Sequence, residues 1–138
     1  MSLSLVMAAT LTFLGASPPS NAPRLNDEQR KVLKQAQARV DALLGSYCKG
    51  KVKIEVNEKS YPRTEEMIRI ADAINDLPAA LSPLSVEEKK VVCRNLKKYV
   101  IEFGQGWIDY KDGRLVVTCG ANVRAGDEQV GALFAKWK

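Results

Sequence analysis

The chain has 138 residues, with 21 Lys and Arg, 16 Asp and Glu, three Cys and no His, and its net charge is +5. The absence of histidine excludes a nucleophile activated by imidazole, a His-ligated zinc site, and pH sensing by imidazole near neutrality. Hydrophobic residues make up 46% and charged residues 27% of the chain, values close to the average of globular proteins, which suggest neither a membrane-embedded bundle nor a disordered chain.

The start of the chain is apolar and carries no charged side chain before Arg24. Its hydrophobic run, residues 3–16, has about 14 residues, which suits the core of a secretory signal peptide and is shorter than the roughly 20 residues of a membrane span. The lack of basic side chains at the start and the position of Pro23 after the small-residue cleavage site depart from that pattern. We expect residues 1–22 to be a signal peptide and linker, residues 23–138 to be a single domain, and the protein to be secreted or periplasmic.

The first half of the chain predicts a helix, a strand and a second helix. Apolar residues at steps of three and four predict the first helix from residue 26 or 27 to about residue 46. The stretch KVKIEVNE, residues 51–58, alternates charged and apolar side chains, which is typical of a half-buried strand. The second helix is predicted from Pro62 to Leu77, where Pro78 would end it.

Ser85 and Glu88 have the spacing of a capping box, in which each side chain accepts a hydrogen bond from the backbone N–H of the other residue. This pair predicts the start of a third helix, and apolar residues at helical spacing extend that prediction to about Phe103. A last helix is predicted to start near Asp127 and to have one apolar side.

Residues 106–119 predict a β-hairpin, because two alternating runs flank Asp112 and Gly113, a pair that tolerates the positive φ angles of a type I′ turn. This turn places Lys111 opposite Arg114 and points Cys119 toward the core. With the element order α-β-α-α-β-β-α, the sequence predicts an α+β domain with a small, about three-stranded, mostly antiparallel sheet and helices packed on at least one face. The second face of the hairpin would carry Trp107, Asp109, Lys111, Arg114, Val116 and Thr118.

The three cysteines have no CxxC spacing, so neither a metal site nor a cofactor is expected. In an oxidising compartment two of them would form a disulfide. The expected pair is Cys93 with Cys119, which would join the third helix to the sheet, and the main alternative is Cys48 with Cys93. A thiol that faces an apolar core has a raised pKa, so Cys119 is predicted to be structural rather than catalytic.

The basic side chains predict a binding surface in two parts. One part is a stripe on the third helix, opposite its apolar side and next to Lys98, for which the alternative is a solvated face. The other part is the second face of the sheet, where Trp107 either anchors a partner or is buried beneath the last helix. The candidate residues are Lys90, Arg94 and Lys97 for the stripe, and Lys51, Lys53, Trp107, Lys111 and Arg114 for the sheet.

These observations predict an exported, non-catalytic module that binds an acidic or anionic macromolecule, such as an inhibitor, an immunity-type protein or an envelope accessory protein. The expected partner is a protein or an anionic envelope component, no stable membrane span is expected, and no catalytic residue is assigned. One alternative is a cytosolic nucleic-acid-binding protein, which the net charge alone favours. The other is a small hydrolase that uses carboxylates, with Asp109 beside Trp107 as its candidate site.

Overall fold

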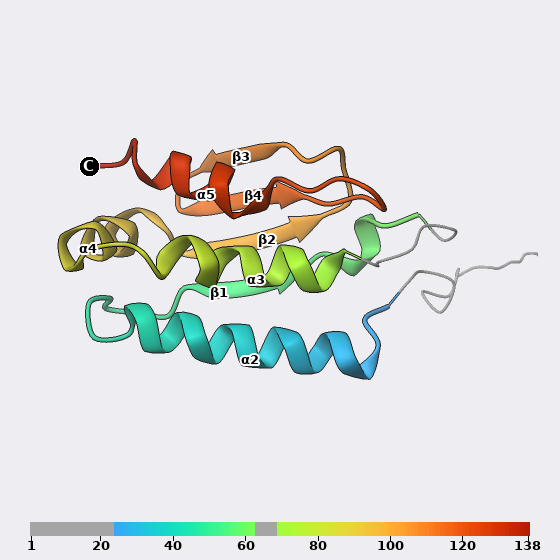
Figure 1. Cartoon of the computed structure of the whole chain (residues 1–138), viewed down its shortest axis with the longest axis horizontal. Helices are drawn as coiled ribbons and strands as arrows, with labels where there is room; N and C mark the ends of the chain where they lie inside the picture. The colour runs from blue at the N-terminus through green and yellow to red at the C-terminus, as the bar shows by residue number, and fades with distance from the viewer. Residues whose placement is uncertain (1–23, 63–68) are drawn as a thin grey trace, which may run out of the picture.

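The structure is a computed structural model that describes residues 24–62 and 69–138. It shows a four-stranded mixed sheet with helices against one face, so the α+β class is confirmed (Figure 1). The predicted signal peptide and linker, residues 1–22, lie outside the described residues. The elements are α2 (Asp27–Leu44), β1 (Lys53–Val56), the 3-10 helix η3 (Glu58–Ser60), α3 (Ile70–Leu81), α4 (Val86–Asn95), β2 (Lys98–Glu102), β3 (Ile108–Lys111), β4 (Arg114–Thr118) and α5 (Gly126–Phe134).

The sheet has the order β1-β2-β4-β3, in which β1, β2 and β4 are parallel and β3 alone is antiparallel to its neighbour. The prediction of about three, mostly antiparallel strands is wrong, because β2 was assigned to the third helix. The middle of β2, Tyr99 to Ile101, is buried on both faces between two other strands. Such a strand has a continuous apolar run instead of alternation, and the run also fits a helical spacing.

The hairpin of β3 and β4 has the predicted register, with Lys111 opposite Arg114 and Ile108 opposite Val117. The turn residues have the expected positive φ angles, 51° at Asp112 and 85° at Gly113. The register does not extend to a pair between residues 106 and 119. Cys119 instead forms an isolated bridge with Arg124, and its N–H donates to the carbonyl of the last residue of β2.

The helix predictions that depend on residues close together in the sequence are confirmed. The Ser85–Glu88 capping box is present, with N–H to oxygen distances of 2.8 and 3.2 Å. The third helix, α4, ends at Asn95 rather than near Phe103, because the chain becomes extended and enters β2. The second helix, α3, contains Pro78 and continues to Leu81. The part of its predicted range at residues 63–68 lies outside the described residues.

Helices α2, α3 and α5 lie side by side on one face of the sheet, with α3 in the middle (Figure 1). Helix α4 lies at the end of the sheet where the parallel strands begin. The core forms between these helices and the sheet. Its largest fully buried side chains are Tyr99, Leu44, Ile70, Ile74, Leu77, Leu81, Leu96, Ile101, Leu115, Val40, Val92 and Val130.

Candidate functional site

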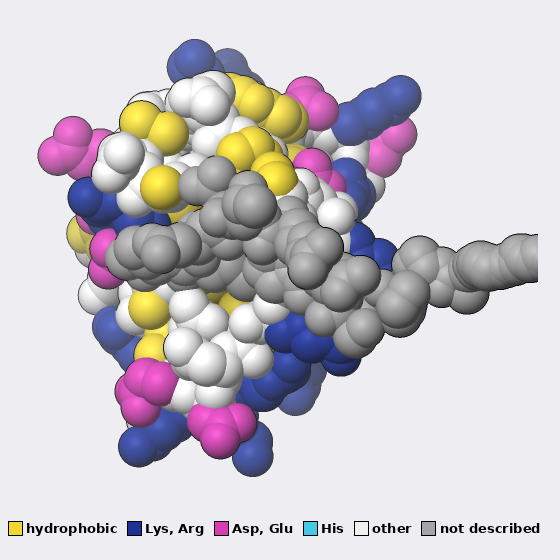
Figure 2. All heavy atoms as spheres, turned by 90° about the vertical axis from the view of Figure 1, so that its right-hand side faces the viewer, with side chains coloured by type: hydrophobic (Ala, Val, Ile, Leu, Met, Phe, Trp, Pro, Cys, Tyr) yellow, Lys and Arg dark blue, Asp and Glu magenta, His cyan; other side chains and the backbone are white. Residues whose placement is uncertain are grey.

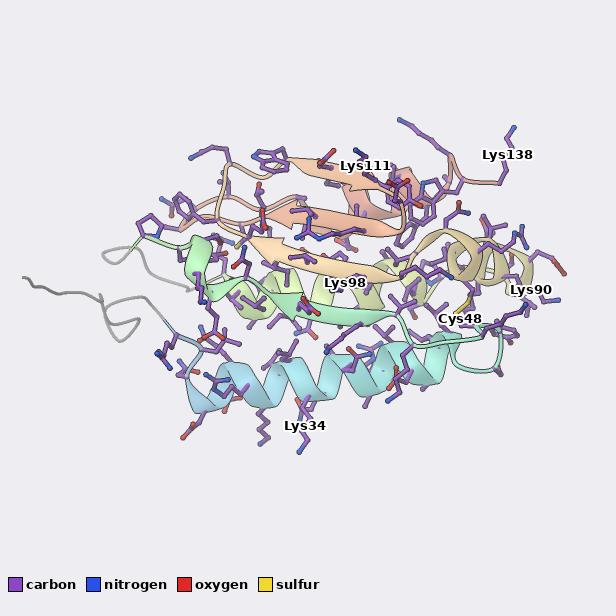
Figure 3. All side chains as sticks on the ribbon, turned by 180° about the vertical axis from the view of Figure 1, so that it is seen from behind. Lys34, Cys48, Lys90, Lys98, Lys111 and Lys138 are labelled. Carbon is purple, nitrogen blue, oxygen red and sulfur yellow. A yellow bond between two sulfur atoms is a disulfide. The ribbon has the colours of Figure 1, made fainter. Side chains whose placement is uncertain are left out.

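One face of the sheet is not covered by any helix of the described residues, and Figure 3 looks onto this face. We call it the open face. Because side chains alternate along a strand, every second residue of each strand points to this side. Its residues are Lys53 and Glu55 of β1, Lys98, Val100 and Glu102 of β2, Asp109 and Lys111 of β3, and Arg114, Val116 and Thr118 of β4.

Basic side chains form a row across the open face, one from each strand. In the parallel pairs, Lys53 lies opposite Lys98, and Lys98 lies opposite Arg114. In the hairpin, Arg114 lies opposite Lys111. Neighbouring strands are about 4.8 Å apart, so the row spans roughly 14 Å. We call these four residues the basic row.

Acidic side chains of the open face neutralise part of the basic row. Glu55 lies 3.3 Å from the Nζ of Lys98 and 4.0 Å from that of Lys53. Glu102 lies 3.7 Å from Arg114. Lys111 has no ion pair within the described residues, and its side chain is exposed. The row therefore keeps a positive surplus, which is largest at the β3 edge.

The centre of the open face is buried although no helix covers it. Val100 and Val116 are only 2% and 5% exposed. Val100 and Val116 lie opposite each other, and their other cross-strand neighbours are Glu55 and Asp109.

Trp107 is 49% exposed, so α5 does not bury it. Its backbone N–H donates to the Thr118 hydroxyl at 2.8 Å, at the end of the hairpin far from the turn. On the open face, Asp109 lies between Trp107 and Lys111. This tryptophan and the basic row therefore lie at opposite ends of β3.

The remaining candidate cations lie near the end of the sheet where the parallel strands begin. Lys51 precedes β1 and lies 3.4 Å from Asp41, and Lys90 on α4 lies 3.6 Å from Glu87. Figure 3 shows Lys90 and Lys138 at this end. Figure 2 shows the opposite end, where basic and acidic side chains are mixed among those drawn in colour.

The predicted stripe on the third helix is only partly present. Lys90 and Arg94 lie on α4, but Lys97 follows the helix and its stem lies against Gly113 of the hairpin turn. Lys98 belongs to β2, and it joins the basic row as the link between β1 and β4. Its role was missed because of the wrong helix end. The alternation of Lys98, Val100 and Glu102 on one face was the signal that could have found it.

The disulfide joins Cys48, after α2, to Cys93 on α4, with a Cα–Cα distance of 5.1 Å (Figure 3). The favoured pair of Cys93 with Cys119 is wrong, and the alternative pair is correct. Cys93 lies on the part of α4 that contacts the end of α2, where its Sγ is 3.9 Å from the carbonyl of Leu44. Cys119 lies after β4, at the far end of a parallel strand. A disulfide is typical of an oxidising, extracellular environment.

Cys119 is 1% exposed and has no disulfide. Burial raises the pKa of its thiol, and the hydrogen bond with Tyr61 and the charge of Arg124 offset part of this effect. The backbone carbonyl of Cys119 accepts a hydrogen bond from the hydroxyl of Tyr61 at 2.8 Å. The Cys119 side chain is thus part of the core, where the hairpin pattern predicted it to point.

A buried ion pair lies on the helix side of the sheet and was not anticipated. Asp76 of α3 is 5% exposed, and its two carboxylate oxygens accept from Nε and Nη2 of Arg124 at 2.9 and 3.3 Å. Burial raises the pKa of Asp76, and Arg124 offsets part of that rise. The pair joins α3 to the segment between β4 and α5, so we assign it a structural role.

Comparisons of this chain with protein-family models, curated proteins and solved structures find no match. No helix in the described ranges is both long and apolar enough to cross a bilayer.

Proposed function

We propose that this chain is an exported, non-catalytic module that binds an acidic protein through the basic row of its open sheet face. The leader-like start of the sequence and the Cys48–Cys93 disulfide support export. The basic row itself is the observation that carries the binding proposal.

The row places like charges directly opposite each other at three successive strand pairs. Each such pair destabilises a sheet by roughly 0.2–1 kcal/mol. The two acidic residues that contact the row relieve this repulsion only in part, because Lys111 has no ion pair within the described residues. A partner with acidic side chains would relieve the rest, which is the reason to assign a binding role to this arrangement.

The charges next to the row favour a protein over a nucleic acid as the partner. Glu55 and Asp109 flank Val100 and Val116 in the next row of the open face, and Glu102 lies beyond them. Measured between Cα atoms along the strands, Glu55 and Asp109 are about 7 Å from the basic row and Glu102 is about 13 Å from it. The carboxylates would repel the phosphates of a nucleic acid. A protein surface, in contrast, can place acidic groups opposite the basic row and basic groups opposite the carboxylates.

The first test reverses two charges of the row, in the variant Lys98→Glu/Arg114→Glu. With poly-L-glutamate as the probe, at an ionic strength of about 0.1 M, we expect the variant to bind about tenfold more weakly than the unmodified chain. Fluorescence anisotropy measures the affinity. The matched control is Lys31→Glu/Arg39→Glu, because both residues are exposed on α2 and the change in net charge is the same. The control is expected to change the affinity less than about twofold.

Two outcomes would reject the proposal. Equal losses in the variant and the control would show that binding follows bulk charge and does not use the row. Tighter binding to duplex DNA than to poly-L-glutamate, lost in the same variant, would instead identify the row as a nucleic-acid site.

A second test concerns stability. Lys111→Glu replaces the repulsion with Arg114 by an attraction and removes no ion pair within the described residues. We expect this substitution to raise the free energy of unfolding by about 0.5 kcal/mol at neutral pH. Urea denaturation at low protein concentration measures the change, and high salt is expected to reduce it. Unchanged or lower stability would contradict the claim that repulsion within the basic row destabilises the folded state.

A further inference from the structure

The two edges of the sheet differ in their hydrogen bonding. At the β1 edge, the side-chain amide of Gln37 donates to the carbonyl of Val52 and accepts from the N–H of Ile54, both at 2.9 Å. These are positions that a further strand would use. Unpaired edge strands are templates for pairing with another chain, so Gln37 closes this part of the β1 edge.

The β3 edge has open positions. The carbonyl of Trp107 accepts from the N–H of Thr118 at 3.0 Å, so the backbone groups of Trp107 point toward β4. Along an antiparallel strand, residues whose backbone groups point toward the partner strand alternate with residues whose groups point away from it. The backbone N–H and C=O groups of Ile108 and Tyr110 therefore point away from β4. No residue of ranges 24–62 and 69–138 hydrogen-bonds to these outward groups. They can accept a fifth strand.

The charges beside this edge are self-complementary. Asp109 and Lys111 flank Tyr110 and point to the open face. If a second copy of β3 pairs antiparallel with Tyr110 opposite Tyr110, Asp109 of each copy lies opposite Lys111 of the other. The register with Ile108 opposite Tyr110 would instead place two Asp109 carboxylates opposite each other. Charge therefore favours the register centred on Tyr110, in which the outward backbone groups of the two Tyr110 residues hydrogen-bond to each other while Ile108 lies opposite Asp112 of the turn.

The other face of the same edge carries aromatic side chains that are only partly buried. The ring centroids of Tyr110 and Trp137 are 4.7 Å apart, and those of Trp137 and Phe134 are 5.0 Å apart. Tyr110, Trp137 and Ile108 all keep some exposure to solvent. In the register centred on Tyr110, the two tyrosines become direct cross-strand neighbours and cover apolar surface of each other.

We propose that two copies of this chain pair through β3, antiparallel and about a two-fold axis at Tyr110, so that their four-stranded sheets form one continuous sheet. The basic rows of both copies lie on the same face of that sheet. Because the edge strand is only four residues long, the dimer is weak, with a dissociation constant on the order of 10–100 μM.

The test exchanges the two charges that face each other across the axis. We expect Asp109→Lys and Lys111→Asp each to raise the dissociation constant about tenfold, because like charges then lie opposite. The double variant Asp109→Lys/Lys111→Asp restores opposite charges and is expected to return to within about threefold of the unmodified chain. Sedimentation velocity over about 5–500 μM protein measures these constants. Glu128→Lys, at an exposed position of α5, is the matched control and should leave dimerisation unchanged.

A second measurement does not require a variant. In the unmodified chain, hydrogen exchange of the Tyr110 amide is expected to slow as the concentration rises, while exchange of the Ile54 amide, which Gln37 already binds, stays constant. A chain that remains monomeric to about 500 μM contradicts the proposal, and so does a double variant as weak as the single variants. The binding test uses Lys98 and Arg114, which lie away from the β3 edge, so the two proposals can fail separately.

Discussion

Replacing both Cys48 and Cys93 by alanine is expected to lower the free energy of unfolding by about 4 kcal/mol. The disulfide closes a loop between residues 45 positions apart, and a cross-link of this length strongly restricts the unfolded chain. For a domain of this size, the loss corresponds to a melting temperature lower by roughly 15–25 °C. Thermal unfolding followed by circular dichroism, with and without a thiol reductant, measures the effect.

The comparison with single variants identifies the pair that forms in solution. The reductant is expected to lower the melting temperature of the unmodified chain and of Cys119→Ala by similar amounts, because both keep the bridge between α4 and the end of α2. It should not change the melting temperature of Cys48→Ala/Cys93→Ala. If Cys93 instead bonded Cys119, the reductant would have no effect on Cys119→Ala, and the pairing described above would be wrong.

The parts of the fold that could be predicted from the sequence depend on residues close to one another in the chain. The Ser85–Glu88 box needs a spacing of three residues, and the turn at Asp112 and Gly113 sets the hairpin register by its own backbone angles. The first helix followed from apolar spacing in a surface helix, where one side is wet. Such signals can be read from the local sequence alone, because they do not depend on contacts with distant parts of the chain.

The parts that could not be predicted depend on neighbours far away in the sequence. Residues 98–102 become a central strand only because β1 and β4 lie on either side, and their apolar run alone also fits a helix. That error removed Lys98 from the candidate site. Lys53, Lys111 and Arg114 were placed on the correct face, because strand alternation is a local signal.

The buried pair of Asp76 and Arg124 could have been predicted in part, because Asp76 is a charged residue on the apolar side of a helix. Asp76 falls on the apolar side of α3, between Ala73 and Ala80, and a carboxylate in such a position needs a partner. The partner itself, 48 residues further along the chain, could not be found without the fold. Sequence could therefore predict the need for an ion pair but not its second member.

Loss of Arg124 is expected to be as damaging as loss of the disulfide. Arg124→Met leaves the carboxylate of Asp76 buried without a positive partner, which lowers the free energy of unfolding by about 3–5 kcal/mol at pH 7. Burial already raises the pKa of Asp76, and removal of Arg124 raises it further, because the guanidinium favours the ionised form. The variant's folded state then holds the Asp76 proton more tightly than the unfolded chain does.

The sign of the pH dependence follows from that difference. Where the folded state binds the proton more tightly, stability falls as the pH rises from the ordinary aspartate pKa, about 4, through the raised folded pKa. Arg124→Met should therefore be closest to the unmodified chain near pH 4 and weakest at neutral pH. Urea denaturation at a series of pH values measures this trend. Asp76→Asn/Arg124→Met, which carries no charge at either position, is expected to lose the trend and to be more stable than Arg124→Met at pH 7. A loss below about 1 kcal/mol that does not vary with pH would show that Asp76 is solvated in solution.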